Sequence, residues 1–192
     1  MEVTEKKIEK AVFVGIIKQN DDERKVNEYL EELVFLAETA GVTGDKKFIQ
    51  RVDKPEKATY VRTGKLEEIS SYCEENQINY VIFDDELTGM QQRNIEKVIK
   101  TSSVIDRTSL ILEIFSQRAK TAYAKMQVEL ARYNYMLPRL AGMWTHLERQ
   151  RGGIGMRGGM GESQIEIDRR IVRERIAKLK EQLKKVDKQM AT

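Results

Sequence analysis

The amino-acid sequence has little of the chemistry that builds metal sites and disulfides. Its 192 residues include one cysteine, Cys73, and one histidine, His146. A single cysteine excludes an intrachain disulfide and a cysteine-cluster metal site, and a single histidine cannot supply a histidine-based metal cage. The longest apolar run, Ala11–Ile17, has seven residues, whereas a membrane-spanning helix needs about 20. We therefore expect no membrane span.

Targeting and catalytic motifs are missing as well. The first ten residues mix Glu and Lys and contain no signal-peptide apolar block, which predicts a cytoplasmic protein. Gly64–Lys65 lacks the upstream glycine and the following Ser or Thr of a nucleotide phosphate loop. No Ser-His-Asp, Cys-His or paired-acid arrangement is complete. We predict no catalytic residue and no metal ligand, and whether the chain is itself an enzyme stays open.

The charge, in contrast, is abundant and unevenly distributed. The formal net charge of +3 conceals a division along the chain. Residues 1–106 hold 16 basic and 22 acidic residues, a charge of −6, whereas residues 107–192 hold 18 basic and 9 acidic residues, a charge of +9. A basic half of this kind predicts a polyanionic partner. The alternative is a set of helix surfaces that are simply rich in Lys and Arg.

The pattern of residues 1–106 predicts a small α/β unit with a parallel sheet in three layers. Continuous β-branched apolar runs are typical of parallel strands that are covered on both faces. Apolar residues spaced by three and four, as between Val26 and Ala40, indicate helices between these runs. Gly41 is a natural end for the first helix, and Thr63 a natural cap for the second. The expected strands are Ala11–Ile17, Lys47–Val52, Tyr80–Phe83 and Ser103–Ile105.

The pattern of residues 107–192 predicts a long antiparallel α-helical hairpin. In the segment that begins at Ser109 and reaches Leu137, apolar residues recur at about every 3.7 positions. This spacing indicates one continuous helix over 109–136. Between Val172 and Met190 they alternate by four and three, the seam of a coiled coil, in a helix over 164–189. The two helices would be roughly 42 and 39 Å long. Similar lengths favour antiparallel packing.

The loop 149–162 between these helices carries the strongest local signal. Six of the twelve glycines fall in residues 152–161, and three arginines lie in or beside them. Glycine lets the backbone approach a surface closely, and arginine makes multidentate contacts with phosphate. We expect a flexible, RNA-binding tip, the alternative being an ordinary linker. The arginines are Arg149, Arg151 and Arg157, and the glycines are Gly152, Gly153, Gly155, Gly158, Gly159 and Gly161.

Three further groups of residues carry weaker signals. Arg169, Arg170 and Arg173 fall within eight residues that hold four arginines, which indicates either an RNA-binding face or a solvated coiled-coil face. Thr63-Gly64-Lys65 opens a helix, where backbone N–H groups favour an anion or nucleotide, although a plain cap is favoured. Asp84–Glu86 follow a predicted strand at the sheet edge where ligands bind, and here too we favour capping of the next helix.

Several motifs resemble the N-terminal and middle regions of HflX-type GTPases. The resemblance covers about residues 11–189, and its middle motifs are the most specific. They are Val104–Ala119, Lys125–Ala131, Leu137–Leu140, Gly142–Glu148, Gly152–Arg157 and Gly161–Arg170, with Gly64–Glu68, Phe83–Leu87 and Gln92–Asn94 upstream. The tip differs from the family's shorter, proline-containing one, because this chain has Arg157-Gly-Gly-Met-Gly-Glu162.

The resemblance implies a ribosome-associated protein that binds RNA of the large subunit and takes part in splitting or rescuing ribosomes. In the family a GTPase domain follows the helical hairpin, and that domain would hold GTP and Mg²⁺ and be a partner of this region. The sequence ends at Thr192 without a phosphate loop, so we expect an N-terminal piece and no cofactor in it. The resemblance also leaves open an ATP-binding or RNA-remodelling domain. A structural protein-interaction module is a third alternative.

Overall fold

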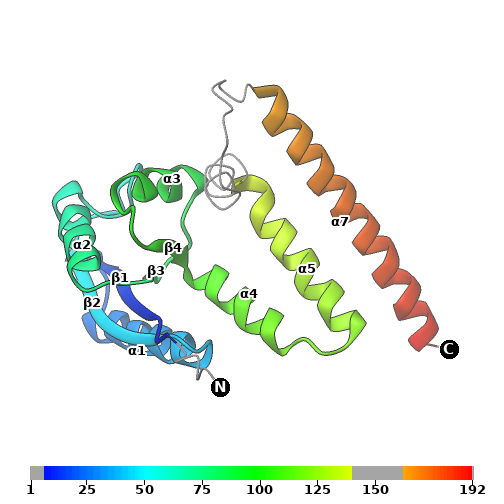
Figure 1. The fold of residues 1–192 in the computed structure, drawn as a ribbon, viewed down its shortest axis with the longest axis horizontal. Helices are drawn as coiled ribbons and strands as arrows, with labels where there is room; N and C mark the ends of the chain where they lie inside the picture. Colours follow the sequence, from blue (N-terminus) through cyan, green and yellow to red (C-terminus); the bar gives the residue numbers. More distant parts are fainter. Residues whose placement is uncertain (1–6, 140–161, 192) are drawn as a thin grey trace, which may run out of the picture. The chain divides into compact units, whose positions relative to one another are not determined.

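The computed structural model describes residues 7–139 and 162–191, with side chains described from 169 onward in the last segment. The chain divides into two compact units, Met1–Ile111 and Leu112–Thr192. Figure 1 colours the chain from the first unit in blue and green to the second in yellow and red. Each unit is described by itself.

A four-stranded parallel sheet forms the centre of the first unit. The strands lie in the order β2-β1-β3-β4, and every neighbouring pair is parallel. They are β1 (Lys10–Ile17), β2 (Thr43–Arg51), β3 (Tyr80–Phe83) and β4 (Ser103–Asp106), and the connecting helices are α1 (Glu23–Thr39), α2 (Thr63–Glu75) and α3 (Gly89–Val98). This confirms the predicted α/β class.

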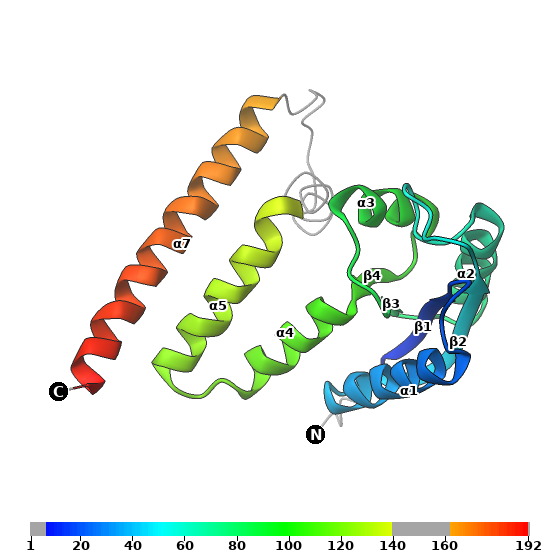
Figure 2. The same cartoon turned by 180° about the vertical axis from the view of Figure 1, so that it is seen from behind.

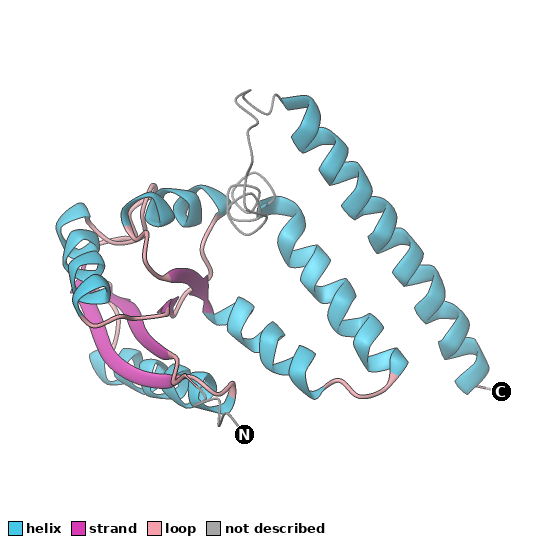
Figure 3. Cartoon of the chain, in the orientation of Figure 1, coloured by secondary structure: helices cyan, strands magenta, loops and turns pink. Residues whose placement is uncertain are grey.

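Strand β1 is buried on both faces, as its continuous apolar sequence predicts. On one face Val12, Val14 and Ile16 join a core cluster with side chains of α2 and α3. On the other face Gly15 approaches α1 so closely that an added Cβ would lie 3.1 Å from Leu30. Helix α1 therefore covers the face opposite to α2 and α3, and the strands and helices of this unit are distinguished in Figure 3.

Helix α1 has a side-chain cap at its start and ends before Gly41, as the sequence predicts. The side chain of Asp22 caps its first turn by accepting a hydrogen bond from the Arg24 amide. After its last turn Gly41 has a φ of +91°, a conformation that glycine adopts without steric cost. Strand β2, in contrast, begins at Thr43, four residues before the expected Lys47. Its first residues are polar because β2 is an edge strand, so only pairing with β1 reveals them.

Two predicted helix caps are wrong. Thr63 is the first residue of α2, and the N-cap position before it is Arg62, whose side chain makes no capping hydrogen bond. Helix α3 is capped by Thr88, whose hydroxyl accepts from the Gln91 amide while the Gln91 side chain accepts from the Thr88 amide. The cap of α3 is therefore this capping box and not Asp84–Glu86.

The predicted single helix over 109–136 is also wrong. The structure has two helices there, α4 (Arg107–Arg118) and α5 (Ala122–Met136), followed by the short 3-10 turn η1 (Leu137–Arg139). Thr121 separates them, because its hydroxyl accepts a hydrogen bond from the Ala124 amide and starts α5. The apolar spacing continues across this break, so periodicity alone does not reveal it.

Helix α7 (Glu162–Met190) packs along α5 within the second unit. Val172 and Ile176 are buried against apolar side chains of α5 and η1. The Tyr123 hydroxyl donates to Asp187 at 2.9 Å, and the Arg175 guanidinium contacts Glu129 at 2.7 Å. The lower-numbered residue of α5 thus pairs with the higher-numbered residue of α7, and Figure 2 shows the two helices side by side. The seam does not extend to Met190, which is 73% exposed.

The two threonines provide a matched test of capping. We expect Thr88→Ala to lower the free energy of unfolding by about 1 kcal/mol, the usual cost of losing an N-cap side chain. Thr63→Ala should change it by less than about 0.5 kcal/mol, because the Thr63 side chain caps nothing. Urea denaturation followed by circular dichroism measures both. Equal losses in the two variants would contradict the assignment of Thr88 as the cap.

Candidate nucleic-acid interface and sheet-edge cavity

The sheet of the first unit has a point where its connections diverge. After β1 the chain continues through α1 to β2, and after β3 it continues through α3 to β4 on the opposite side of the sheet. In parallel α/β sheets, ligands bind outside the carboxyl ends of the strands at such a point. A cavity of about 420 Å³ lies there, lined by residues that include Lys18, Asp21, Tyr60, Asp84 and Asp85.

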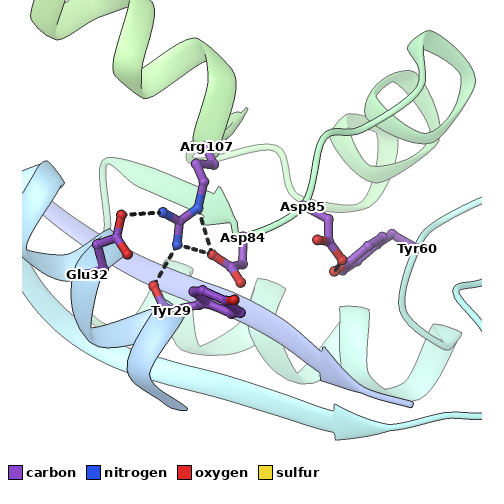
Figure 4. Close-up of polar contacts among 6 residues, drawn as sticks. All are labelled: Tyr29, Glu32, Tyr60, Asp84, Asp85 and Arg107. Carbon is purple, nitrogen blue, oxygen red and sulfur yellow. Dashed lines mark hydrogen bonds and ion pairs between the residues drawn. The ribbon is translucent and has the colours of Figure 1, made fainter. Parts of the chain in front are cut away.

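Arg107 fixes one side of this cavity. Its guanidinium contacts Asp84 through Nε at 3.0 Å and through Nη2 at 2.5 Å. It also donates to the Tyr29 carbonyl at 2.6 Å and to Glu32 of α1 at 3.2 Å, as Figure 4 shows. Burial raises the pKa of the Asp84 carboxyl, and the hydrogen bond and positive charge of Arg107 oppose that shift. Arg107 therefore joins the end of β3 to α1 through a shielded ion pair.

Tyr60 and Asp85 form the other side. The Tyr60 hydroxyl donates a hydrogen bond to the Asp85 carboxylate, and its ring packs edge-on against Phe83 with centroids 5.5 Å apart. Burial, followed by the hydrogen bond to Asp85, raises the pKa of this phenol. Tyr60 also has a φ of 64°, a conformation that is uncommon for a residue with a bulky side chain. The sequence gives no signal for the contact between Tyr60 and Asp85, since the two residues are 25 positions apart.

The charges around the cavity are mostly negative. Four aspartates, Asp21, Asp22, Asp84 and Asp85, line it together with two lysines. Such a lining repels the phosphates of a nucleotide unless a cation accompanies them. Within the described residues, no three His, Cys, Asp or Glu side chains are grouped so that they could hold a metal ion. The preference for Asp84–Glu86 as a helix cap is wrong, because Asp84 binds Arg107 and Asp85 binds Tyr60.

The structure also locates the other residues singled out in the first unit. Thr63 and Gly64 are exposed at the start of α2, and Lys65 forms an ion pair with Glu68 at 2.9 Å. None of the three lines the sheet-edge cavity. Cys73 is fully buried in the core, and burial raises the pKa of its thiol. It behaves as a small hydrophobic residue of the core.

Helix α7 carries the basic surface of the second unit. From Arg169 to Met190 it has nine basic and three acidic residues. Arg173 is exposed and Arg169 is half-buried, while Arg170 lies 3.9 Å from Glu174 with its side chain 70% exposed. The structure thus places these three predicted RNA-binding arginines within five consecutive residues of α7, shortly before the Arg175–Glu129 pair. The tip residues Arg149, Arg151 and Arg157, and the glycines around them, lie outside the described residues.

The sequence predicts no membrane-spanning helix, and the helices of the structure can be compared with that prediction. None of those in the described part of the chain combines the length and the apolar character required to cross a bilayer.

The Arg107–Asp84 pair generates a prediction about pH. A raised carboxyl pKa means that the native state keeps a proton that the unfolded state has already released, so stability falls as pH rises from about 3.9 through the raised value. Removing Arg107 removes the contacts that oppose this shift. We expect Arg107→Met to raise the pKa of Asp84 further and to lower the free energy of unfolding at pH 7 by about 2 kcal/mol.

Carbon-13 NMR titration of the Asp84 carboxyl and urea denaturation at several pH values measure these effects. The matched control is Arg51→Met, because the pair of Arg51 with Glu23 is 69% and 56% exposed. An exposed pair contributes about 0–1 kcal/mol. An unchanged pKa of Asp84 in the Arg107 variant would contradict the conclusion that Arg107 lowers the pKa of this carboxyl.

Two family models match consecutive parts of this chain. The model described as the N-terminal region of GTP-binding GTPases matches residues 27–116. The model described as the middle region of GTP-binding GTPases matches residues 118–192. The boundary between the two matches falls in α4, close to the division between the two compact units.

Named relatives agree with these matches. The chain is 59% identical over 184 residues to GTPase HflX of Flavobacterium psychrophilum, covering 96% of this chain and 44% of the relative. It is 42% identical over 181 residues to GTPase HflX of Escherichia coli, covering 94% of this chain and 41% of the relative. The chain thus spans less than half the length of these relatives.

A solved structure shares the fold. It is a GTP-binding protein from the archaeon Sulfolobus solfataricus in complex with GDP, with a TM-score of 0.63 and 24% identity, covering 94% of this chain and 46% of that one. Both family models, and relatives of high identity along nearly the whole chain, lead to one assignment. This chain belongs to the HflX family of GTP-binding proteins, in which it corresponds to the N-terminal and middle regions.

Proposed function

We propose that this chain is the ribosome-binding part of an HflX GTPase, and that its helical unit binds RNA of the large ribosomal subunit. The observation that carries the proposal is the excess of exposed cations on α7, with nine basic and three acidic residues between Arg169 and Met190. RNA presents a dense row of phosphates, so binding to it is dominated by such cations. Residues 1–106, in contrast, have 16 basic and 22 acidic residues, and the sheet edge of the first unit is lined by four aspartates.

The arrangement of α5 and α7 supports a two-helix arm. Their paired residues, Tyr123 with Asp187 and Glu129 with Arg175, run in opposite directions along the chain. In an antiparallel hairpin of this kind, the connection between residues 139 and 162 joins two adjacent helix ends. We propose that Arg149, Arg151 and Arg157, in this connection, contact RNA together with Arg169, Arg170 and Arg173.

The activity of the whole protein belongs to the same proposal. The relatives are named GTPases, and no phosphate-loop motif occurs in residues 1–192. GTP and Mg²⁺ would therefore bind to a GTPase domain outside this sequence, which would be a partner of the units described above. The splitting or rescue of ribosomes would combine RNA binding by this chain with GTP hydrolysis by that domain.

A second candidate function is ATP binding by the first unit. The cavity at the divergence of β1 and β3 favours it, because this is the ligand position of parallel α/β sheets. The four aspartates of its lining disfavour it, since they repel a triphosphate. Calorimetry with ATP and Mg²⁺ distinguishes the two, and micromolar affinity that becomes tighter in Asp85→Asn, which removes one of the repelling charges, would support a nucleotide site in this cavity.

Removal of the arginines of α7 tests the main proposal. We expect Arg169→Ala/Arg170→Ala/Arg173→Ala to weaken binding to purified large subunits. It should also reduce the slope of log K against log salt by about two to three, because each lost phosphate contact accounts for about 0.7–0.9. The measurement is cosedimentation at several salt concentrations.

The control replaces three exposed arginines of the first unit, as Arg24→Ala/Arg51→Ala/Arg62→Ala. The two variants lose the same charge, so general electrostatics affects both equally. The separate variant Arg149→Ala/Arg151→Ala/Arg157→Ala tests the contribution of the tip. If the unmodified chain does not cosediment with large subunits, the proposed function is wrong. If it cosediments and self-associates without any dependence on these arginines, a protein-interaction module is the better description.

A further inference from the structure

The cations of α7 are not spread evenly around the helix. Arg169, Arg173, Lys180, Lys184 and Lys188 recur at intervals of four, seven, four and four residues. At 3.6 residues per turn these intervals place all five within an arc of about 100°. We call these five residues the cationic row. Ala177, which is exposed, occupies the one helical turn of the row that lacks a cation.

The opposite flank of α7 has a different composition. Lys178 and Lys185 lie there, more than about 100° from the middle of the row. Lys185 forms an ion pair with Glu181 at 2.9 Å, so part of the positive charge on this flank is neutralised. The same number of lysines can therefore be removed from either flank, with a different outcome expected for each.

The acidic residues of α7 leave the middle of the row unneutralised. Among residues 169–191 they are Glu174, Glu181 and Asp187. Glu174 lies near Arg170, and Asp187 accepts a hydrogen bond from Tyr123 of α5. Within the described part of the chain, neither Lys180 nor Lys184 pairs with a carboxylate. Both lysines are exposed to solvent.

The packing of α7 shows which polyanion the row fits. A helix that binds a membrane surface inserts an apolar face beside its cations. The apolar residues Val172, Ile176 and Leu179 of α7 are instead buried, at 7%, 8% and 1% exposure, the first two of them against α5 and η1. The exposed apolar residues of α7, Ile171 and Met190, lie near opposite ends of the helix and form no continuous apolar face for a bilayer, whereas a phosphate backbone requires charge alone.

The geometry points to the cationic row as one continuous RNA-binding face, along which α7 lies lengthwise on the phosphate backbone of a structured RNA. This inference rests on the proposed function and extends its binding surface beyond the arginines of the first turns to Lys180, Lys184 and Lys188. The row spans 20 residues, or about 28 Å from its first to its last residue. Lysine ammonium groups act as point charges on phosphate, and phosphate contacts carry no sequence information. This site therefore orients α7 on RNA and does not select a base sequence.

Two double variants of equal charge test the site. We expect Lys180→Gln/Lys184→Gln to lower the slope of log K against log salt by about 1.5 for binding to large subunits, and the affinity at about 0.1 M salt by roughly thirtyfold. The opposite-flank variant, Lys178→Gln/Lys185→Gln, should lose less than about threefold. Lys180→Arg/Lys184→Arg keeps the charge and should bind normally. Circular dichroism checks that the helix content of all variants is unchanged.

The outcomes separate the site from the function on which it rests. Equal losses in the two Gln variants would overturn the cationic row and leave RNA binding by diffuse charge in place. Failure of the unmodified chain to bind both large subunits and purified large-subunit RNA would overturn the proposed function as well. Binding to phosphatidylglycerol vesicles that depends on Lys180 and Lys184, with unchanged RNA binding, would assign the row to a membrane and overturn the inference.

Discussion

Burial of one apolar stripe of α7 determines what the rest of the second unit presents to solvent. Val172 and Ile176 are enclosed by α5 and η1, and Leu179, one turn further on, is also buried. Each buried side chain of this size contributes about 1.5–3 kcal/mol, whereas an exposed ion pair contributes about 0–1 kcal/mol. The apolar contacts therefore fix the rotation of α7 about its own axis. The polar contacts Tyr123–Asp187 and Glu129–Arg175 then adjust to that rotation, and the lysines and arginines occupy the remaining surface.

The first unit uses its charges differently. Arg107 is tied to Asp84, Glu32 and the Tyr29 carbonyl, and Asp85 is held by Tyr60. These contacts connect the carboxyl end of β3 to α1 and to the segment that carries Tyr60, so they stabilise the edge of the sheet. The aspartates that remain around the cavity give this edge a negative potential, which is unfavourable for RNA. The division of charge between the two halves of the chain thus follows closely the division into two compact units.

Local sequence patterns were sufficient to predict secondary structure where a residue's environment depends on its immediate neighbours. Tyr80–Phe83 is a strand as predicted, because four apolar residues in an otherwise polar segment are stable only when buried. Local patterns failed to predict the bounds and caps of elements where a residue distant in the sequence determines them. The start of β2 at Thr43 depends on pairing with β1. The choice of Thr88 over Asp84–Glu86 as a cap depends on Arg107 and Tyr60, which occupy two of those carboxylates. The break before α5 is a local feature that was also missed. It depends on the hydroxyl of Thr121, and the spacing of apolar residues carries no information about such a cap.

The sequence by itself determined the α/β class, the order of strands and helices along the first half, and the excess of positive charge in the second half. These properties follow from composition and from spacing along the chain, which are local quantities. The tertiary structure alone decided that Arg107 and Tyr60 complete the sheet edge and which face of α7 is left to solvent. Each of these depends on contacts between residues far apart in the sequence, whose side chains meet only after the chain has folded.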